Sequence, residues 1–316
     1  MTKVKSLFLA CFAFFLGLSI SAQAYTISIN QYVEHPSLNA AVEGFKDQLK
    51  ANNIEVTYHE HNAQAKNSTV TQIVNLMIDE KPDLILAVAT PSAQQTAQKI
   101  KDIPILFTAV TDPVNAGLVP SLAAPDANIT GTTDMNPVAL QLALIKEIQP
   151  TAKNIGFIYN AGEANSVVQR DMARDAAVNL GFNLVEATAD STANVNSAAQ
   201  SLIGRVDAIY LPTDNTVIAS LEPIIKVSLE HKIPIYPAED DSIRKAGLAT
   251  YSISYYGLGQ QTGRMATKIL VDNISPRDIP VEDQTDHKLI VNLGYAQQVG
   301  IDIPQSVLDK AQEILQ

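Results

Sequence analysis

The sequence predicts an α/β protein with two Rossmann-like lobes, each built on a parallel sheet, joined by a hinge that the chain crosses several times. The length of 316 residues favours two domains. Short apolar runs with strand composition alternate with helical patterns of about a dozen residues, which is typical of parallel strands joined by right-handed crossovers. An internal repeat indicates that the two lobes resemble each other.

The repeat comprises a short strand followed by a polar loop that ends in glycine. Lys101–Phe107 leads to Gly117, and His231–Tyr236 leads to Gly247. The interval from the proline of each strand to its glycine is equal, 104 to 117 and 234 to 247. Upstream, segments 82–92 and 206–216 also match, since each is an apolar strand that ends in small and hydroxyl side chains. We therefore expect two copies of one βα series that face each other across a cleft.

The first series begins with a strand and then a helix on which Leu38, Val42, Phe45 and Leu49 share one face. The later strands are short apolar runs, and serine is a suitable cap for the helices that follow. In order, we expect strand 26–29, helix 38–50, strand 54–58, helix 68–79, strand 84–89, helix 92–100, strand 105–107 and edge strand 128–131.

The second series begins with a helix that has Pro137 in its first turn, a position that proline favours. Asp214 or Asn215 is a suitable N-cap for the helix after strand 208–211. In order, we expect helix 138–148, strand 154–159, helix 166–180, strand 183–187, helix 196–203, strand 208–211, helix 216–229, strand 233–236, strand 248–253, helix 258–271, strand 289–292 and helix 304–314.

Because each lobe needs a complete sheet, we expect the chain to cross between the lobes near Asn136, Ser254 and Val281. This prediction assigns residues 25–136 and 254–281 to the N-terminal lobe. Residues 137–253 and 282–316 form the C-terminal lobe.

The first 24 residues have the pattern of a secretory signal peptide. Lys3 and Lys5 precede an apolar run over 7–20, and Ala22-Gln-Ala24 has the small-x-small form of a cleavage site. We expect cleavage after Ala24 and localisation in the periplasm of a Gram-negative cell. Cys11 is the only cysteine, so the mature chain has no disulfide and no thiolate metal site. Lipid attachment at Cys11 is a weaker alternative, because the apolar run continues beyond it.

The charge of the chain disfavours two classes of partner. The formal net charge is −11, and removing Lys3 and Lys5 leaves 20 basic against 33 acidic residues, or −13. This balance argues against nucleic acid and anionic membranes as partners, although solubility alone also explains an acidic surface.

The candidate binding residues follow strand ends, where open α/β sheets bind their ligands. Two helix starts, at Thr90 with Ser92 and at Asn165 with Ser166, offer backbone N–H groups to a carboxylate, or they are simply capped helices. The same loops are poor in Lys and Arg and carry several acids. An acidic rim suits a ligand with an ammonium group.

Among these acids, Asp214 and Asp240 are the predicted partners for an ammonium group, with Asp112 as a further site residue. Each of them could instead be a solvated loop residue. Tyr255, at an expected crossing between the lobes, is the predicted ring contact for an aromatic ligand.

The sequence gives little support to an enzyme or to a cofactor-binding protein. The sequence has no Gly-x-Ser-x-Gly, no phosphate-binding loop and no Gly-x-Gly-x-x-Gly. His59 and His61 could place two imidazoles on one strand face, but no third metal ligand is evident. We therefore expect a protein that is not an enzyme and that has no metal and no cofactor.

Five motifs in order carry a family resemblance: Ala89–Ser92, Ile103–Pro113, Tyr159–Ser166, Leu211–Asn215 and Ile253–Gly259. In these motifs the chain resembles the substrate-binding proteins of ABC transporters that have the type I periplasmic binding protein fold, in the tryptophan-binding-protein-like family. The resemblance covers nearly the whole mature chain.

The resemblance implies a solute receptor that binds an aromatic amino acid (Phe, Trp or Tyr) between its lobes. It also implies a monomer that docks on an ABC permease in the inner membrane. Two alternatives stay open: a sensory module that hands its closed form to a membrane kinase, and an exported hydrolase that uses Asp214 and Asp240.

Overall fold

The structure is a computed structural model that describes residues 24–125 and 127–316. The predicted signal peptide, up to residue 23, lies outside the described residues. In the described residues, no helix is long and apolar enough to cross a membrane.

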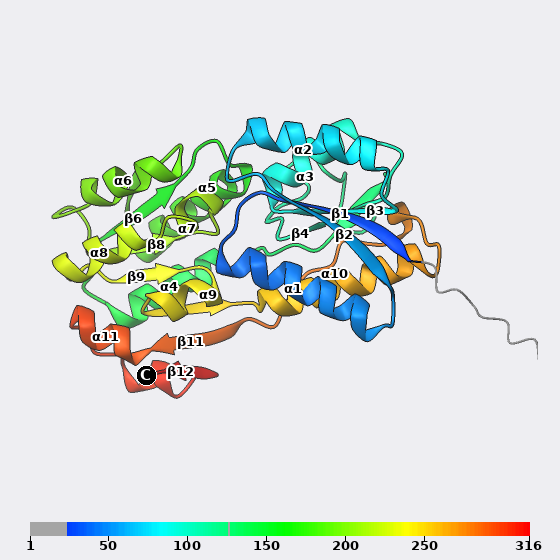
Figure 1. Ribbon diagram of the computed structural model, residues 1–316. Coiled ribbons are helices and arrows are strands. Elements are labelled where there is room, and N and C mark those ends of the chain that lie inside the picture. The colour runs from blue at the N-terminus through cyan, green and yellow to red at the C-terminus, as the bar shows by residue number, and fades with distance from the viewer. Residues whose placement is uncertain (1–23, 126) are drawn as a thin grey trace, which may run out of the picture.

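The first lobe is built on a five-stranded parallel sheet with the order β2-β1-β3-β4-β5. The bounds of these strands are β1 Tyr25–Gln31, β2 Val56–Asn62, β3 Leu84–Val88, β4 Ile105–Thr108 and β5 Ile129–Gly131. The helices of this lobe are α1 Pro36–Ala51, α2 Asn67–Glu80, α3 Thr90–Lys99 and α10 Tyr255–Leu270. In Figure 1 this lobe lies on the right, with α1 beside α10.

Glycines bring α1 and α10 into close contact. A Cβ added at Gly259 would lie 1.9 Å from the carbonyl oxygen of Ala41, and one added at Gly44 would lie 2.1 Å from the carbonyl oxygen of Tyr256. Only glycine allows backbones to approach this closely. Helix α10 comes late in the chain, so this contact fixes the C-terminal part of the sequence against the first lobe.

The second lobe repeats the strand order in a four-stranded parallel sheet, β7-β6-β8-β9. Its strands are β6 Asn154–Tyr159, β7 Asn183–Thr188, β8 Ala208–Leu211 and β9 Ile235–Pro237. Its helices are α4 Val138–Ile148, α5 Ala164–Leu180, α6 Val195–Ser201, α7 Asn215–Ile218, α8 Glu222–His231 and α9 Asp240–Lys245, with a 3₁₀ turn, η1, over Thr192–Asn194. The shared order 2-1-3-4 agrees with the sequence repeat.

A third, small sheet, β10-β11-β12, extends the second lobe (Figure 1). Its strands are β10 Ala249–Ser252, β11 Lys288–Asn292 and β12 Glu313–Leu315, and the neighbouring short helices are α11 Leu293–Val299 and α12 Gln305–Leu308. Strands β10 and β11 are antiparallel, whereas β11 and β12 are parallel.

Each lobe has its own hydrophobic core. One core contains the apolar residues of β1, β3, β4, α1 and α10, and the other contains those of β6, β8, α4 and β11. The chain leaves one core for the other after β5, after β10 and between η2 (Pro276–Asp278) and β11. On this basis we propose the lobe boundaries given above, 25–136 with 254–281 and 137–253 with 282–316.

The predicted fold class is confirmed, and three element predictions are corrected. The helix expected over 216–229 is two helices, α7 and α8, and Pro223 lies in the first turn of α8. The helix expected over 304–314 is the short α12, and the residues after it form β12 beside β11. The expectation of parallel strands fails for β10 and β11, which form an antiparallel pair.

Candidate functional site

A cavity lies where the carboxyl ends of the two sheets face each other. Ten residues line it, and it encloses about 220 Å³ of space free of protein atoms, counting its mouth. They are His35, Leu38, Ala109, Thr111, Asp134 and Tyr255 from the first lobe, and Asn165, Thr213, Asn215 and Glu239 from the second. Nearly all of them come soon after the end of a strand, which is where ligands bind in open α/β sheets.

Polar contacts join the lobes around this cavity. Ser37, in the first turn of α1, donates a hydrogen bond to the carboxylate of Glu239 in the other lobe. The hydroxyls of Thr111 and Thr213 lie 3.4 Å apart. His35 and Asn215, one from each lobe, both line the cavity, and the side chain of Asn215 acts to raise the pKa of His35. The lobes are therefore held together by polar groups rather than by an apolar interface alone.

Asp134 is the carboxylate that the first lobe contributes. Its Oδ2 accepts a hydrogen bond of 2.7 Å from the hydroxyl of Tyr255, and its Oδ1 accepts one of 3.0 Å from Thr111. The side chain is 3% exposed, and burial raises the pKa of Asp134 above its usual value. Each oxygen keeps a lone pair for a further donor.

Glu239 is the carboxylate that the second lobe contributes, directly after β9. It is 2% exposed, and burial raises its pKa to about 8. The hydrogen bonds from Ser37 and Ser242 both go to Oε2, so Oε1 is free to meet another donor. A buried carboxylate of this kind is stable as an anion only when a cation comes close to it.

A second pair of acids, Asp214 and Glu163, lies beside the cavity. Asp214 accepts hydrogen bonds from the backbone N–H of Asn160 (2.6 Å) and of Val217 (2.8 Å) and from the hydroxyl of Ser166 (2.6 Å). Burial and the charge of Glu163 raise the pKa of Asp214 to about 8. Both oxygens of Asp214 thus fix the starts of α5 and α7.

No lysine or arginine is buried in residues 24–125 and 127–316. The arginines and lysines there that form ion pairs are partly or fully exposed. The interlobe region therefore holds buried acids without a buried basic side chain to balance them. This electrostatic environment favours a positively charged ligand group.

The two helix starts predicted as carboxylate sites, at Thr90 with Ser92 and at Asn165 with Ser166, differ in their hydrogen bonds. The Oγ1 of Thr90 is buried and has no hydrogen-bond partner, whereas the hydroxyl of Ser92 donates to Asn30 at 3.3 Å. The side chain of Asn165 lines the cavity, and its amide nitrogen donates to the Thr213 carbonyl at 2.9 Å. Its Oδ1 has no partner.

Two predicted acids lie next to the cavity lining rather than within it. Asp112 caps a turn, since its Oδ1 accepts from the backbone N–H of Asn115 at 2.9 Å. Asp240 begins α9, and its Oδ1 has no hydrogen-bond partner among the described residues.

The two remaining predicted residues contact buried acids. Ser166 donates a hydrogen bond to Asp214. Tyr255 lines the cavity and donates a hydrogen bond to Asp134.

Of the ten lining residues, sequence reasoning selected only Asn165 and Tyr255 as site residues, and it left out six polar ones, among them the two acids of the cavity. These residues are His35, Thr111, Asp134, Thr213, Asn215 and Glu239. The signal was present in the sequence, because Asp134 and Glu239 both follow predicted strands. Only the structure shows which acid after a strand faces the cavity and which one caps a helix.

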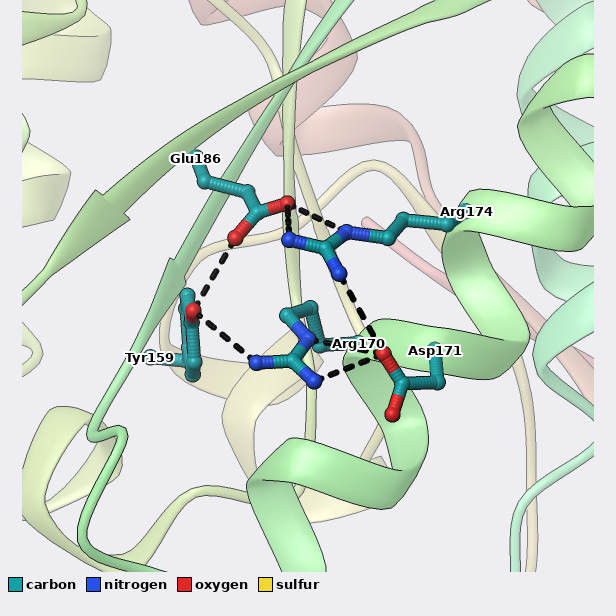
Figure 2. Close-up of polar contacts among 5 residues, drawn as sticks. All are labelled: Tyr159, Arg170, Asp171, Arg174 and Glu186. Carbon is teal, nitrogen blue, oxygen red and sulfur yellow. Dashed lines mark hydrogen bonds and ion pairs between the residues drawn. The ribbon is translucent and has the colours of Figure 1, made fainter.

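A network of polar side chains holds α5 against its sheet (Figure 2). The hydroxyl of Tyr159, at the end of β6, donates to Glu186 of β7 at 2.9 Å and accepts from Arg170 at 3.4 Å. Arg174 donates to Glu186 at 2.6 Å. This network fixes the helix whose first turn carries Asn165 and Ser166.

Two alanines at the edge of the first sheet that faces the cavity have strained backbone conformations with positive φ. Ala89, before α3, has φ 75°, and Ala109, after β4, has φ 55°. A non-glycine residue with positive φ costs about 1 kcal/mol or more, and such residues gather at ligand-binding sites. The two positions follow neighbouring strands, β3 and β4, at the cavity edge of the sheet.

Comparisons with known proteins agree with this geometry. Residues 26–315 match the family described as ABC transporter substrate binding protein. A tyrosine-binding protein of Clostridioides difficile (strain R20291) is 40% identical over 278 residues, which cover 86% of this chain and 80% of that protein.

Two solved structures show how the lobes compare. The ABC domain from Streptococcus pneumonia in complex with L-Trp has a TM-score of 0.89 and 33% identity, and the match covers 93% of this chain and 100% of that one. A ligand-free, open substrate-binding protein from Clostridium difficile has a TM-score of 0.67 and 39% identity, with 92% and 99% covered. The present arrangement is thus nearer to the complex, although the open structure shares more identical residues.

Proposed function

This chain belongs to the family of ABC transporter substrate-binding proteins, and we propose that it is the periplasmic receptor of an importer that binds an aromatic amino acid between its lobes. Members of this family are solute-binding proteins, so the chain is a binding protein and not an enzyme. They act outside the cytoplasm, in agreement with the predicted signal peptide.

One observation carries the proposal: the cavity brings together two buried carboxylates, Asp134 and Glu239, and no lysine or arginine of residues 24–125 and 127–316 is buried opposite them. An α-ammonium group would balance this charge and donate to both acids. We therefore assign the ammonium to Glu239 and Asp134. Asp214 and Asp240, the acids expected from sequence, take supporting positions beside them.

The α-carboxylate is assigned to helix N-termini. Helix α5 begins beside the cavity, which Asn165 lines, and α3 begins directly after β3, at the same edge of the first sheet. The partial positive charge of a helix N-terminus favours an anion. The buried Thr90 hydroxyl has no hydrogen-bond partner among the described residues, so it can donate to the carboxylate. Ser92 supports this turn through Asn30, and Ser166 supports the start of α5 through Asp214.

The aromatic class is supported by the walls of the cavity and by the relatives. Leu38, Ala109 and the ring of Tyr255 supply apolar surface beside the acids. One relative is named for tyrosine, and one similar structure contains L-Trp. The small size of the cavity leaves no room for an oligosaccharide.

We further propose that the protein acts as a monomer and delivers its ligand to an ABC permease in the inner membrane. Deleting the gene should abolish uptake of the labelled amino acid and leave other solutes unaffected. Normal uptake accompanied by a lost transcriptional response would instead support a sensory role.

The binding proposal is tested by thermal unfolding of ligand-stripped protein against a panel of amino acids. A ligand at a hundred times its dissociation constant stabilises the folded state by about 2.7 kcal/mol, which raises the melting temperature by several degrees. We expect such a shift for aromatic amino acids. A panel in which none of them shifts the midpoint would refute the proposed ligand class.

A further inference from the structure

His35 has a buried position that its local structure does not explain. It follows β1 and precedes the first turn of α1, yet its side chain makes no capping hydrogen bond. It is 6% exposed and lines the cavity, and its Nδ1 has no hydrogen-bond partner within the part of the chain that the structure describes. A buried polar atom without a partner is costly, so this atom points to a ligand group.

The neighbours of His35 determine what its free nitrogen can do. Burial, aided by the charge of Lys245, lowers the pKa of His35 to about 4, so the ring is neutral and has one donor and one acceptor nitrogen. The amide nitrogen of Asn215 donates to Glu163 at 2.6 Å, and the Asn215 side chain acts to raise the pKa of His35, which is the effect of a carbonyl oxygen that accepts a ring N–H. The unpartnered Nδ1 is therefore the acceptor.

The α-ammonium of the ligand does not supply the missing donor. An ammonium has three N–H donors, and the cavity offers three other acceptors for them. These are the carboxylates of Glu239 and Asp134 and the unpartnered Oδ1 of Asn165. Once they are satisfied, Nδ1 of His35 still needs a donor, which the side chain of the ligand can supply.

We propose that His35 accepts a hydrogen bond from the ring substituent of the ligand, so that the site selects the phenol of tyrosine or the indole of tryptophan over phenylalanine. This inference rests on the proposed function and adds to it the specificity within the aromatic class. Phenylalanine fills the same space but leaves Nδ1 unpaired in a buried site. A site built around a ligand hydrogen bond rejects the analogue that lacks it.

The first test uses the unmodified protein and measures dissociation constants by isothermal titration calorimetry. We expect tyrosine or tryptophan to bind about ten- to a hundredfold more tightly than phenylalanine. Methylation removes the ring donor, so O-methyltyrosine and 1-methyltryptophan should bind more weakly than their parents. Equal affinity for phenylalanine and for both parents would overturn the inference.

The second test compares two variants of His35. His35→Leu removes the acceptor and should abolish the preference by weakening the tyrosine or tryptophan complex about tenfold or more, with phenylalanine affinity unchanged. His35→Asn places an amide at the δ position and should restore part of the preference. The matched control is His231→Leu, an exposed histidine at the end of α8, which should change nothing.

The outcomes separate this inference from the proposed function. Binding of no aromatic amino acid to the unmodified protein would refute the proposed function. An equal loss of affinity for all three ligands in His35→Leu would show that His35 contacts the common backbone of the ligand, and it would overturn only the ring assignment. A melting temperature of each variant without ligand shows whether the fold is intact.

Discussion

Replacing Glu239 with glutamine should have opposite effects on binding and on stability. Glutamine keeps the shape and can still accept the hydrogen bond from Ser37, but it carries no charge. In the complex, the α-ammonium then loses its anionic partner from the second lobe. Breaking a buried, hydrogen-bonded charge pair costs about 2–5 kcal/mol, so we expect the dissociation constant to rise about thirtyfold to several thousandfold.

The stability effect follows from the pKa of the same carboxylate. Burial raises the pKa of Glu239 from 4.5 to about 8, so the folded protein holds this proton more tightly than the unfolded chain does. The contribution to stability is fully present below pH 4.5 and is lost as the pH rises through 8. A shift of one pKa unit corresponds to about 1.4 kcal/mol, so the folded protein loses stability on the order of 5 kcal/mol between these pH values. If the lobes open, water reaches the carboxylate and this loss of stability becomes smaller.

The assay combines calorimetric titration at neutral pH with urea unfolding of ligand-free protein at pH 5 and pH 9. Glu239→Gln should bind weakly at neutral pH and be more stable than the unmodified protein at pH 9, with a smaller difference at pH 5. Glu230→Gln, on the exposed end of α8, is the control and should change neither quantity. Unchanged affinity in Glu239→Gln would refute the ammonium assignment, and equal stability at pH 9 would refute the desolvation argument.

Three further predictions concern packing, support and the carboxylate site. Gly259→Ala should destabilise the protein by about 2 kcal/mol or more in urea unfolding, because its Cβ would meet Ala41, whereas Gly257→Ala, with its nearest atoms at 3.4 Å, should be neutral or slightly stabilising. Asp214→Ala should lower the free energy of unfolding by about 3 kcal/mol, because the N–H groups of Asn160 and Val217 and the hydroxyl of Ser166 lose their acceptor. A variant with an unchanged melting temperature would contradict this supporting role. Thr90→Val should weaken ligand binding about tenfold in calorimetry and leave ligand-free stability unchanged, and full affinity would place the carboxylate elsewhere.

Sequence periodicity predicted most of the fold because burial imposes it directly. Strands such as β3 and β8 are wholly buried, and their apolar runs are visible without any tertiary information. The segment 304–314 shows the limit of this reasoning. Its apolar spacing suits a helix, but its last residues pair with β11, a contact that depends on where a distant strand lies.

The site was only partly predictable for a related reason. Sequence identifies which acids follow strands, but the choice between a cavity residue and a helix cap depends on backbone direction over one or two residues. Asp214 turns back to accept from Val217 of its own helix, whereas Glu239 stands one residue before α9 and meets Ser37 from the other lobe. The adjacent Asp240 has the same chemistry but lies outside the cavity lining.

The buried acids also explain how ligand occupancy can control the arrangement of the lobes. If the lobes open when no ligand is bound, closing them removes Glu239 and Asp134 from water, and no lysine or arginine in the described part of the chain is buried beside them, so closure alone would be unfavourable. Under the proposed function, a ligand ammonium would offset this desolvation, because it would interact with both acids only when the lobes are together. The ligand thus has a higher affinity for the closed state, and this difference in affinity is what shifts the population toward closure. A neutral analogue without the ammonium should therefore bind poorly and also leave the lobes open.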